Sequence, residues 1–198
     1  MTVIRVSTSV RMNAAEAKMG KRRNSRALGL KLTFALATNS DAPALATLHN
    51  LVGEELTRRF GEGMWSWRHT ERGVLANLRK PKFSKILTAC VDGKIVGSLR
   101  LATKKPWAID VSYFTAVQRP LYLTGMAVYP ELQGKGVGGR LLKEAEKLAR
   151  DWPGDSIRLD AFDAAVGAGA FYAKHGYREV ARMKYKGDPL IYFELLLA

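Results

Sequence analysis

Apolar positions along the chain follow two periods, and these divide it into predicted strands and helices. Residues 31–38 (KLTFALAT) alternate and then run apolar, which predicts a first strand. Residues 41–60 carry leucines at helical spacing, and Gly61 is a typical helix end. A second helix is predicted over residues 70–79, because Pro81 cannot continue it. The chain therefore begins its regular structure as strand, helix, helix.

The clearest local signal is a hairpin over residues 85–103. Two β-rich segments flank the Asp-Gly pair at 92–93, a dipeptide that favours two-residue hairpin turns. Residues 104–120 are aromatic and irregular, which predicts a long connection. Residues 121–130 (LYLTGMAVYP) then read as a buried strand, and the internal Gly125 indicates a bulge or a close backbone approach.

The second half of the chain adds a helix, a strand, a short helix and two strands. A helix face runs from Leu141 to Trp152. The later elements are predicted at residues 156–162, 164–177, 178–187 and 189–198. The full order is β-α-α-β-β-β-α-β-α-β-β, which indicates a mixed α/β fold.

Charge divides the chain unevenly. The net charge is +14, and residues 1–31, with eight basic residues and one acidic residue, carry a net charge of +7, half of the total. We expect a flexible basic extension at residues 1–31 and a single domain at residues 32–198. The extension reads as a solvated tail or upstream start, as a transit peptide, or as a nucleic-acid arm. Nucleic acid is disfavoured as a partner because residues 1–31 contain no aromatic side chain for base stacking.

Cysteine content and hydropathy indicate in which cellular compartment the protein is expected. Cys90 is the one cysteine of the chain, so no intrachain disulfide is possible and a reducing, cytoplasmic compartment is favoured. No apolar run approaches the length of about 18 residues that would suggest a membrane-spanning helix. The histidines His49, His69 and His175 lack metal-ligand spacing, so we expect no metal and a structural or solvent-facing role for each.

Four glycines within residues 134–139 separate the strand at 121–130 from the helix that follows. Backbone N–H groups at a helix N-terminus bind anions, and Lys135 and Arg140 add positive charge nearby. The letters also satisfy the GxGxxG dinucleotide pattern, but that pattern needs parallel strands on both sides, whereas an antiparallel hairpin precedes it here. A P-loop is excluded because no GK[ST] is present.

Two motifs together resemble the GNAT superfamily of N-acetyltransferases. The first is Q-x-x-G-x-G at Gln133, Gly136 and Gly138, within LTGMAVYPELQGKGVGGRLL. The second is FYxKxGY, within LDAFDAAVGAGAFYAKHGYREV. The order of elements from Lys31 onward also matches. The resemblance implies a mixed, mostly antiparallel sheet of six or seven strands, splayed between the two signature strands and flanked by about four helices.

The resemblance further implies acetyl-CoA as cosubstrate, with its pantetheine arm between the splayed strands. Met126, Ala127 and Val128 are expected beside the pantetheine and thioester. Tyr172 matches the tyrosine that serves the leaving thiolate as an acid. The pyrophosphate is expected on the backbone of the loop, at Gln133, Gly134, Lys135, Gly136, Val137, Gly138 and Gly139.

Two departures from the family pattern concern the chemistry. Some members carry a glutamate that acts as general base where this chain has Tyr122. The general base of this chain could therefore be Asp110, Asp160 or a water molecule. We take Asp160 as the candidate catalytic residue. Many members have an asparagine near the position of Ala165 that bonds the pantetheine, so that contact is absent or moved.

The reaction implied is acetyl transfer to a primary amine of a small molecule or peptide. Specificity is expected to reside in residues 59–79 and 104–120. Aromatic side chains there are candidates for an acceptor pocket or for the core: Trp65, Trp67, Trp107, Tyr113 and Phe114. The rival interpretation is a non-catalytic acyl-CoA-binding or sensor module. The assembly is also open, with a homodimer as one possibility.

Overall fold

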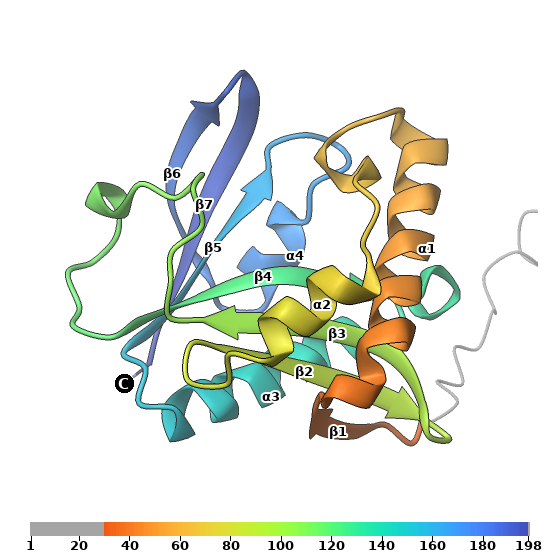
Figure 1. The fold of residues 1–198 in the computed structure, drawn as a ribbon. Coiled ribbons are helices and arrows are strands. Elements are labelled where there is room, and N and C mark those ends of the chain that lie inside the picture. Colours follow the sequence, from red (N-terminus) through yellow and green to blue (C-terminus); the bar gives the residue numbers. More distant parts are fainter. Residues whose placement is uncertain (1–29, 198) are drawn as a thin grey trace, which may run out of the picture. The chain divides into compact units, whose positions relative to one another are not determined.

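The structure, a computed structural model, describes residues 30–197. In this part of the chain seven strands form one sheet in the order β1-β2-β3-β4-β5-β7-β6, with four α-helices around it (Figure 1). The strands are β1 (Thr33–Leu36), β2 (Ser84–Val91), β3 (Lys94–Ala102), β4 (Pro120–Val128), β5 (Ser156–Phe162), β6 (Arg178–Tyr185) and β7 (Asp188–Leu196). The helices are α1 (Ala42–Phe60), α2 (Glu71–Leu78), α3 (Val137–Asp151) and α4 (Gly169–Lys174). The predicted extension at residues 1–31 falls almost wholly outside the described residues.

The predicted order of elements is confirmed, and the local signals explain why. Asp92 and Gly93 have φ angles of 48° and 75°, the left-handed pair that a two-residue hairpin turn requires. Thr70 caps α2 by accepting a hydrogen bond from the backbone of Gly73 at 3.1 Å. None of the helices from residue 30 to residue 197 has the length and apolar character needed to cross a bilayer.

One predicted element was too long. The helix expected over residues 164–177 is α4, which begins only at Gly169 and ends at Lys174. The preceding segment turns back so tightly on the end of β5 that a Cβ atom at Gly167 would lie 1.7 Å from the carbonyl oxygen of Phe162. This close backbone contact replaces the first turns of the expected helix.

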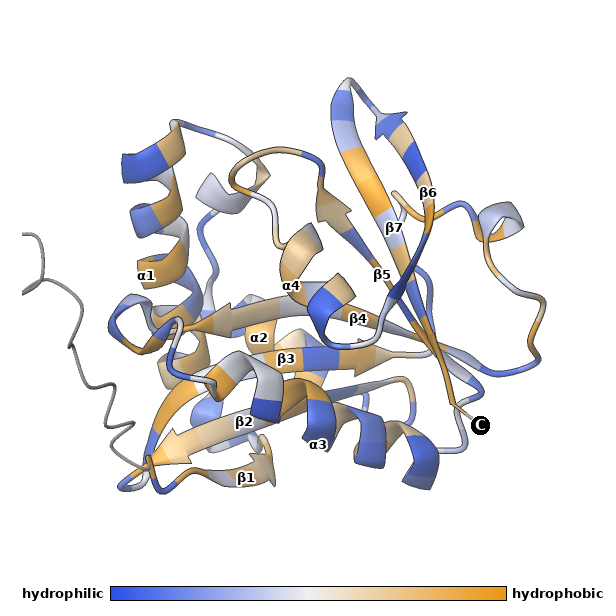
Figure 2. Ribbon diagram, turned by 180° about the vertical axis from the view of Figure 1, so that it is seen from behind, coloured by the Kyte–Doolittle hydropathy of each residue, from blue (hydrophilic) through white to orange (hydrophobic). Residues whose placement is uncertain are grey.

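Alternating residues of β3 contact helices on opposite faces of the sheet. A Cβ atom at Gly97 would meet side chains of α3, at 2.9 Å from Leu141. The next residue, Ser98, bonds His49 of α1 across the other face at 3.2 Å. Helices α1 and α2 therefore cover one face and α3 the other, as the two opposite views show (Figures 1 and 2). Helix α3 turns apolar residues toward the sheet: Val137, Leu141, Leu142, Ala145 and Ala149 are buried.

The sheet opens between β4 and β5. These strands run parallel and pair only from Pro120 opposite Ser156 to Tyr122 opposite Arg158. Beyond that point β4 continues along β3, whereas β5 continues along β7, so the two strands diverge (Figure 1). The expected mixed, splayed sheet is confirmed.

The predicted irregularity at Gly125 lies in the diverging part of β4. Ser98 pairs with Ala127 and Arg100 with Thr124, so two residues of β4 oppose one of β3. This is a bulge, and Gly125 has a φ of 55° within it. The bulge changes the direction of the strand at the point where it has left β5.

Candidate active site

The glycine loop leads directly into α3, and its first two glycines serve the backbone conformation. Gly134 and Gly136 have φ angles of 72° and 84°, and no atom lies within 4 Å of a Cβ atom placed on either. Gly136 is the N-cap of α3, which begins at Val137. By helix geometry, the N–H groups of the first turn have no carbonyl one turn earlier to bond. The loop therefore offers donors and open space to an anion.

The other two glycines serve packing. A Cβ atom at Gly138 would lie 3.1 Å from the ring of Phe171, and one at Gly139 would lie 2.4 Å from Nε2 of His175. These two glycines allow α4 to approach the first turn of α3. The cluster thus has two physical causes, and the sequence alone did not separate them.

Some side chains around the loop hold it in place, and others are exposed. Gln133 donates from Nε2 to the carbonyl oxygen of Val128 at 3.1 Å, so its amide ties the loop to the end of β4. The side chain of Val137 is buried, which leaves its backbone as the part able to contact a ligand. Lys135 is exposed. The guanidinium of Arg140 lies 5.6 Å from the ring centroid of Phe34 in β1.

The end of β4 presents backbone groups toward the open side. Tyr129 donates its N–H to the carbonyl oxygen of Val96 in β3 at 2.9 Å. Backbone groups alternate in direction along a strand, so those of Val128 point away from β3, toward the side of β5. Ala127 is buried and pairs with Ser98.

Tyr172 of α4 reaches across the opening to β4. Its hydroxyl lies 3.7 Å from the sulfur of Met126, and its side chain is buried. Burial raises the pKa of Tyr172, and the negative charge of Asp160 raises it further. The hydroxyl is therefore protonated at neutral pH and is a proton donor rather than a base.

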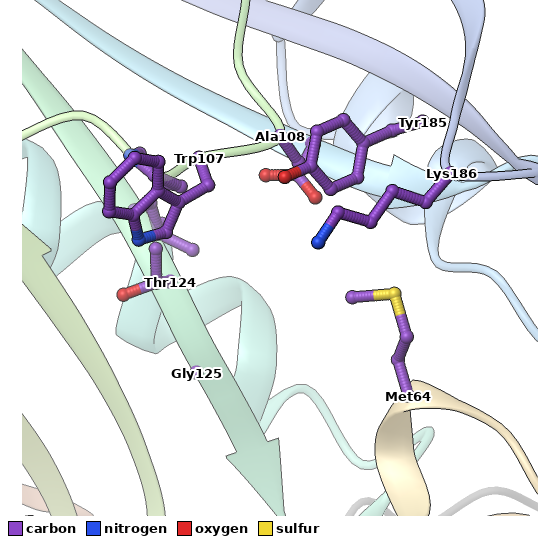
Figure 3. A pocket seen from close by; sticks show the side chains of 10 residues that line it. Met64, Trp107, Ala108, Thr124, Gly125, Tyr185 and Lys186 are labelled. Carbon is purple, nitrogen blue, oxygen red and sulfur yellow. The ribbon is translucent and has the colours of Figure 1, made fainter.

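A pocket of about 590 Å³ opens where β4 and β5 diverge, and we call it the acceptor-side pocket (Figure 3). Asp160 of β5 lines it, and burial raises the pKa of this carboxyl group. The remaining lining residues are Met64, Pro106, Trp107, Ala108, Leu123, Thr124, Gly125, Tyr185 and Lys186. Asp160 thus faces a space that is bordered by both diverging strands.

The other candidate base does not line this pocket. Asp110 accepts hydrogen bonds from the backbone N–H and the hydroxyl of Ser112, at 3.0 and 2.8 Å, and caps a short turn. These bonds lower the pKa of Asp110. Its carboxylate is engaged in the turn, which leaves Asp160 as the acidic side chain of the pocket.

The candidate aromatic residues separate likewise. Trp107 lines the acceptor-side pocket, whereas Trp65 packs edge-on against Phe162, with ring centroids 5.4 Å apart. Tyr113 and Phe114 pack against Tyr192, at 6.0 and 5.4 Å between centroids. Most of these aromatic side chains therefore organise the loops rather than face the pocket.

Sequence reasoning missed the contributions of the β6–β7 turn. Tyr185 and Lys186 line the pocket because β7 lies beside β5 in the sheet, which brings this turn over the opening. The two-residue spacing between β6 and β7 predicts a hairpin, but it does not say which strand the hairpin adjoins.

Two histidines lie behind the bulge of β4. The rings of His49 and His69 have centroids 4.7 Å apart, and a Cβ atom at Gly125 would lie 3.5 Å from Cε1 of His49. Asn50 holds His69 through two hydrogen bonds to its backbone, at 2.8 and 3.0 Å. Burial and, to a smaller extent, the neighbouring His69 lower the pKa of His49 to about 4. Within residues 30–197, no group of His, Cys, Asp and Glu side chains is arranged to hold a metal ion.

Solved structures of other proteins share this fold. An acetyltransferase of the GNAT family from Streptococcus pneumoniae is 21% identical, with a TM-score of 0.65 over 85% of this chain and 100% of that chain. The protein yncA from Salmonella typhimurium, solved with its cofactor acetyl-CoA, is 18% identical, with a TM-score of 0.63 over 84% and 94%. The ribosomal-protein-alanine N-acetyltransferase from Brucella melitensis is 19% identical, with a TM-score of 0.64 over 83% and 99%.

A comparison with curated protein sequences gave no match. The model of the acetyltransferase (GNAT) family, however, matches residues 46–177. This segment covers more than half of the chain and contains the diverging strands, the glycine loop and Tyr172. The chain belongs to the acetyltransferase (GNAT) family and is an acyltransferase.

Proposed function

We propose that the protein transfers an acetyl group from acetyl-CoA to a primary amine by direct attack of the amine on the thioester. The observation that carries this proposal is the opening between β4 and β5. It has a glycine-lined helix N-terminus on one side and a pocket with a partly buried carboxyl group on the other. The single cysteine of the chain supports a cytoplasmic setting, and we propose residues 32–198 as the catalytic domain.

The residues present fit acetyl-CoA. Gly134 and Gly136 leave open space beside the donors of α3, which suits a pyrophosphate. The carbonyl oxygen of Val128 accepts from Gln133, which leaves the backbone N–H of Val128 to face the opening and suit the pantetheine arm. Acetyl-CoA supplies an acetyl group on a thioester, whose C–S bond breaks as the C–N bond to the amine forms.

Two side chains of this chain handle the protons. Asp160 orients the incoming amine in the acceptor-side pocket and takes up its proton, directly or through water. Its raised pKa brings its affinity for a proton closer to that needed near neutral pH. Tyr172 holds its proton firmly and lies beside Met126 at the opening, where it donates that proton to the departing sulfur.

The test compares two neighbouring tyrosines. Tyr172→Phe removes the proposed acid, and we expect turnover to fall by roughly 100-fold, at the lower end of general acid catalysis, while CoA binding is retained. Tyr177→Phe is the matched control, because its ring centroid lies 5.7 Å from that of Tyr172. Its buried hydroxyl has no hydrogen-bond partner in the described residues. We expect the control to keep native turnover.

The measurement is release of the CoA thiol in the presence of a panel of primary amines, with CoA binding measured separately by calorimetry. If the native chain binds CoA tightly but turns over none of the amines, the protein is an acyl-CoA-binding module and the proposal fails. If Tyr172→Phe and Tyr177→Phe lose activity equally, Tyr172 is not the acid.

A further inference from the structure

The acceptor-side pocket contains two opposite charges that are not paired with each other. Asp160 comes from β5 and Lys186 from the β6–β7 turn. Across residues 30–197, neither side chain takes part in a salt bridge, although other acidic and basic residues of the domain form nine of them. A carboxylate and an ammonium that share one pocket without pairing can each bind a group of a ligand.

Lys186 lies at the tip of the β6–β7 hairpin and lines the pocket. Lys186 and Gly187 have φ angles of 53° and 95°, so they form the left-handed two-residue turn of this hairpin. Its ammonium points into the pocket, between Tyr185 and Met64 (Figure 3). The ammonium lies 5.5 Å from the ring centroid of Tyr185. The cation is exposed to solvent and faces the pocket.

Large apolar side chains form the wall beside these charges. The side chain of Trp107 is 86% exposed and that of Met64 is 50% exposed, yet both line the pocket. An apolar ligand group that covers them would remove apolar surface from water, at about 25 cal/mol per Å². The pocket volume of about 590 Å³ lies within the range of small-molecule sites.

The position of Asp160 fixes which end of a ligand reacts. Asp160 of β5 shares the acceptor-side pocket with Thr124 and Gly125 of β4, so this carboxylate faces the opening between the two strands. Lys186 lies on a separate element, at the tip of a hairpin. An amine beside Asp160 would therefore be at the reacting end, and a negative group of the same molecule would extend toward Lys186.

We propose that the acetyl acceptor is a small zwitterionic amine with an apolar group, such as a free apolar amino acid. Its amino group lies beside Asp160, its carboxylate binds Lys186, and its apolar group covers Trp107 and Met64. This inference rests on the proposed acetyl transfer. Polycationic amines are disfavoured, because a second positive charge would face the ammonium of Lys186.

The test uses matched acceptor pairs that differ by a carboxylate: L-phenylalanine against 2-phenylethylamine, and L-methionine against 3-(methylthio)propylamine, with spermidine as a polycation. A hydrogen bond to a charged group contributes about 1.5–3 kcal/mol, which corresponds to a preference of roughly 10- to 100-fold in kcat/KM. We expect the native chain to prefer the amino acid of each pair by this factor. Lys186→Met should remove the preference by raising KM for the amino acids, with little change for the plain amines.

Lys184→Glu is the matched control for a charge reversal at Lys186. It lies two residues away on β6, is exposed and does not line the acceptor-side pocket. We expect Lys186→Glu to reverse the preference toward the plain amines and Lys184→Glu to leave it unchanged. Equal kcat/KM for the two members of each pair in the native chain would overturn the inference. So would a preference that survives Lys186→Met.

Binding separates this inference from the proposed reaction. Calorimetry with L-phenylalanine in the presence of CoA reports the site without turnover, and the inference requires binding that Lys186→Met weakens at least about 10-fold. If spermidine is acetylated and both amino acids are ignored, acetyl transfer stands and the zwitterion inference fails. If L-phenylalanine binds through Lys186 but no amine is acetylated, the ligand class stands and the proposed reaction fails.

Discussion

The partly buried histidine behind the β4 bulge makes the stability of the protein depend on pH. His49 of α1 packs against Ser98 and the bulge at Gly125. Burial lowers its pKa from 6.5 to about 4 in the folded state, whereas the unfolded chain restores the value of about 6.5. Between these two values the unfolded state binds a proton that the folded state does not. The contribution of His49 to stability is therefore fully present above pH 6.5 and is lost as the pH falls toward 4.

The size of this effect follows from the two pKa values. Linkage gives a loss of about 2 kcal/mol in the free energy of unfolding at pH 5 relative to pH 8 from His49 alone. This is a large share of the total for a domain whose stability is about 5–15 kcal/mol. Burial also lowers the pKa of His69, which acts in the same direction.

The perturbation is His49→Gln, since a glutamine amide can still bond Ser98 but does not titrate. Urea denaturation of both chains at several pH values between 5 and 8, followed by tryptophan fluorescence, gives the free energies. We expect the native chain to lose about 2 kcal/mol more than the variant between pH 8 and pH 5. An equal loss in both chains would refute the reasoning, because it would show that His49 is not held neutral by the fold.

Two further substitutions test the sheet and the glycine loop. Glu194 is fully buried and bonds Arg158 at 3.3 Å, so Glu194→Ala should cost about 3–5 kcal/mol in urea denaturation by leaving a buried guanidinium unpaired; a loss under 1 kcal/mol would contradict this. Gly136 has a φ of 84°, so Gly136→Ala should lower stability by about 1 kcal/mol and weaken CoA binding in calorimetry. Gly93→Ala is its control, because Gly93 has a similar φ of 75° in a distant hairpin. The control should lower stability but leave CoA affinity unchanged. Equal losses of CoA affinity in the two variants would show that the loop is not part of the CoA site.

The elements that were predicted correctly are those whose cause is local. The Asp-Gly pair at 92–93 defines its hairpin through two left-handed residues, and Thr70 defines the start of α2 through one hydrogen bond. The short helix was predicted too long because its alanines favour a helix in isolation. In the fold, the contact of Gly167 with Phe162 overrides that preference.

The parts of the candidate site that lie within sequence motifs could be predicted from the sequence. The glycine loop and Tyr172 lie at the opening of the sheet. Asp160 was the chosen candidate base, but the sequence left Asp110 and water as alternatives, and the fold places Asp110 in a turn and Asp160 in the pocket. Lys186 was not a candidate, because its position depends on β7 lying next to β5. That neighbour relation is a property of the whole topology and has no local signal in the sequence.

The three-residue contact between β4 and β5 also has a consequence for folding. Every other neighbouring pair of strands in the sheet is antiparallel and pairs over at least four residues. The backbone hydrogen bonds of the sheet therefore fall into one block from β1 to β4 and another from β5 to β7. We expect each block to behave as a cooperative unit in native-state hydrogen exchange, with the seam opening at lower free energy than either block. A ligand seated between β4 and β5 would bridge the two units and raise the protection of both. Ligand binding in the opening would then stabilise the junction between β4 and β5, where the sheet has its shortest strand pairing.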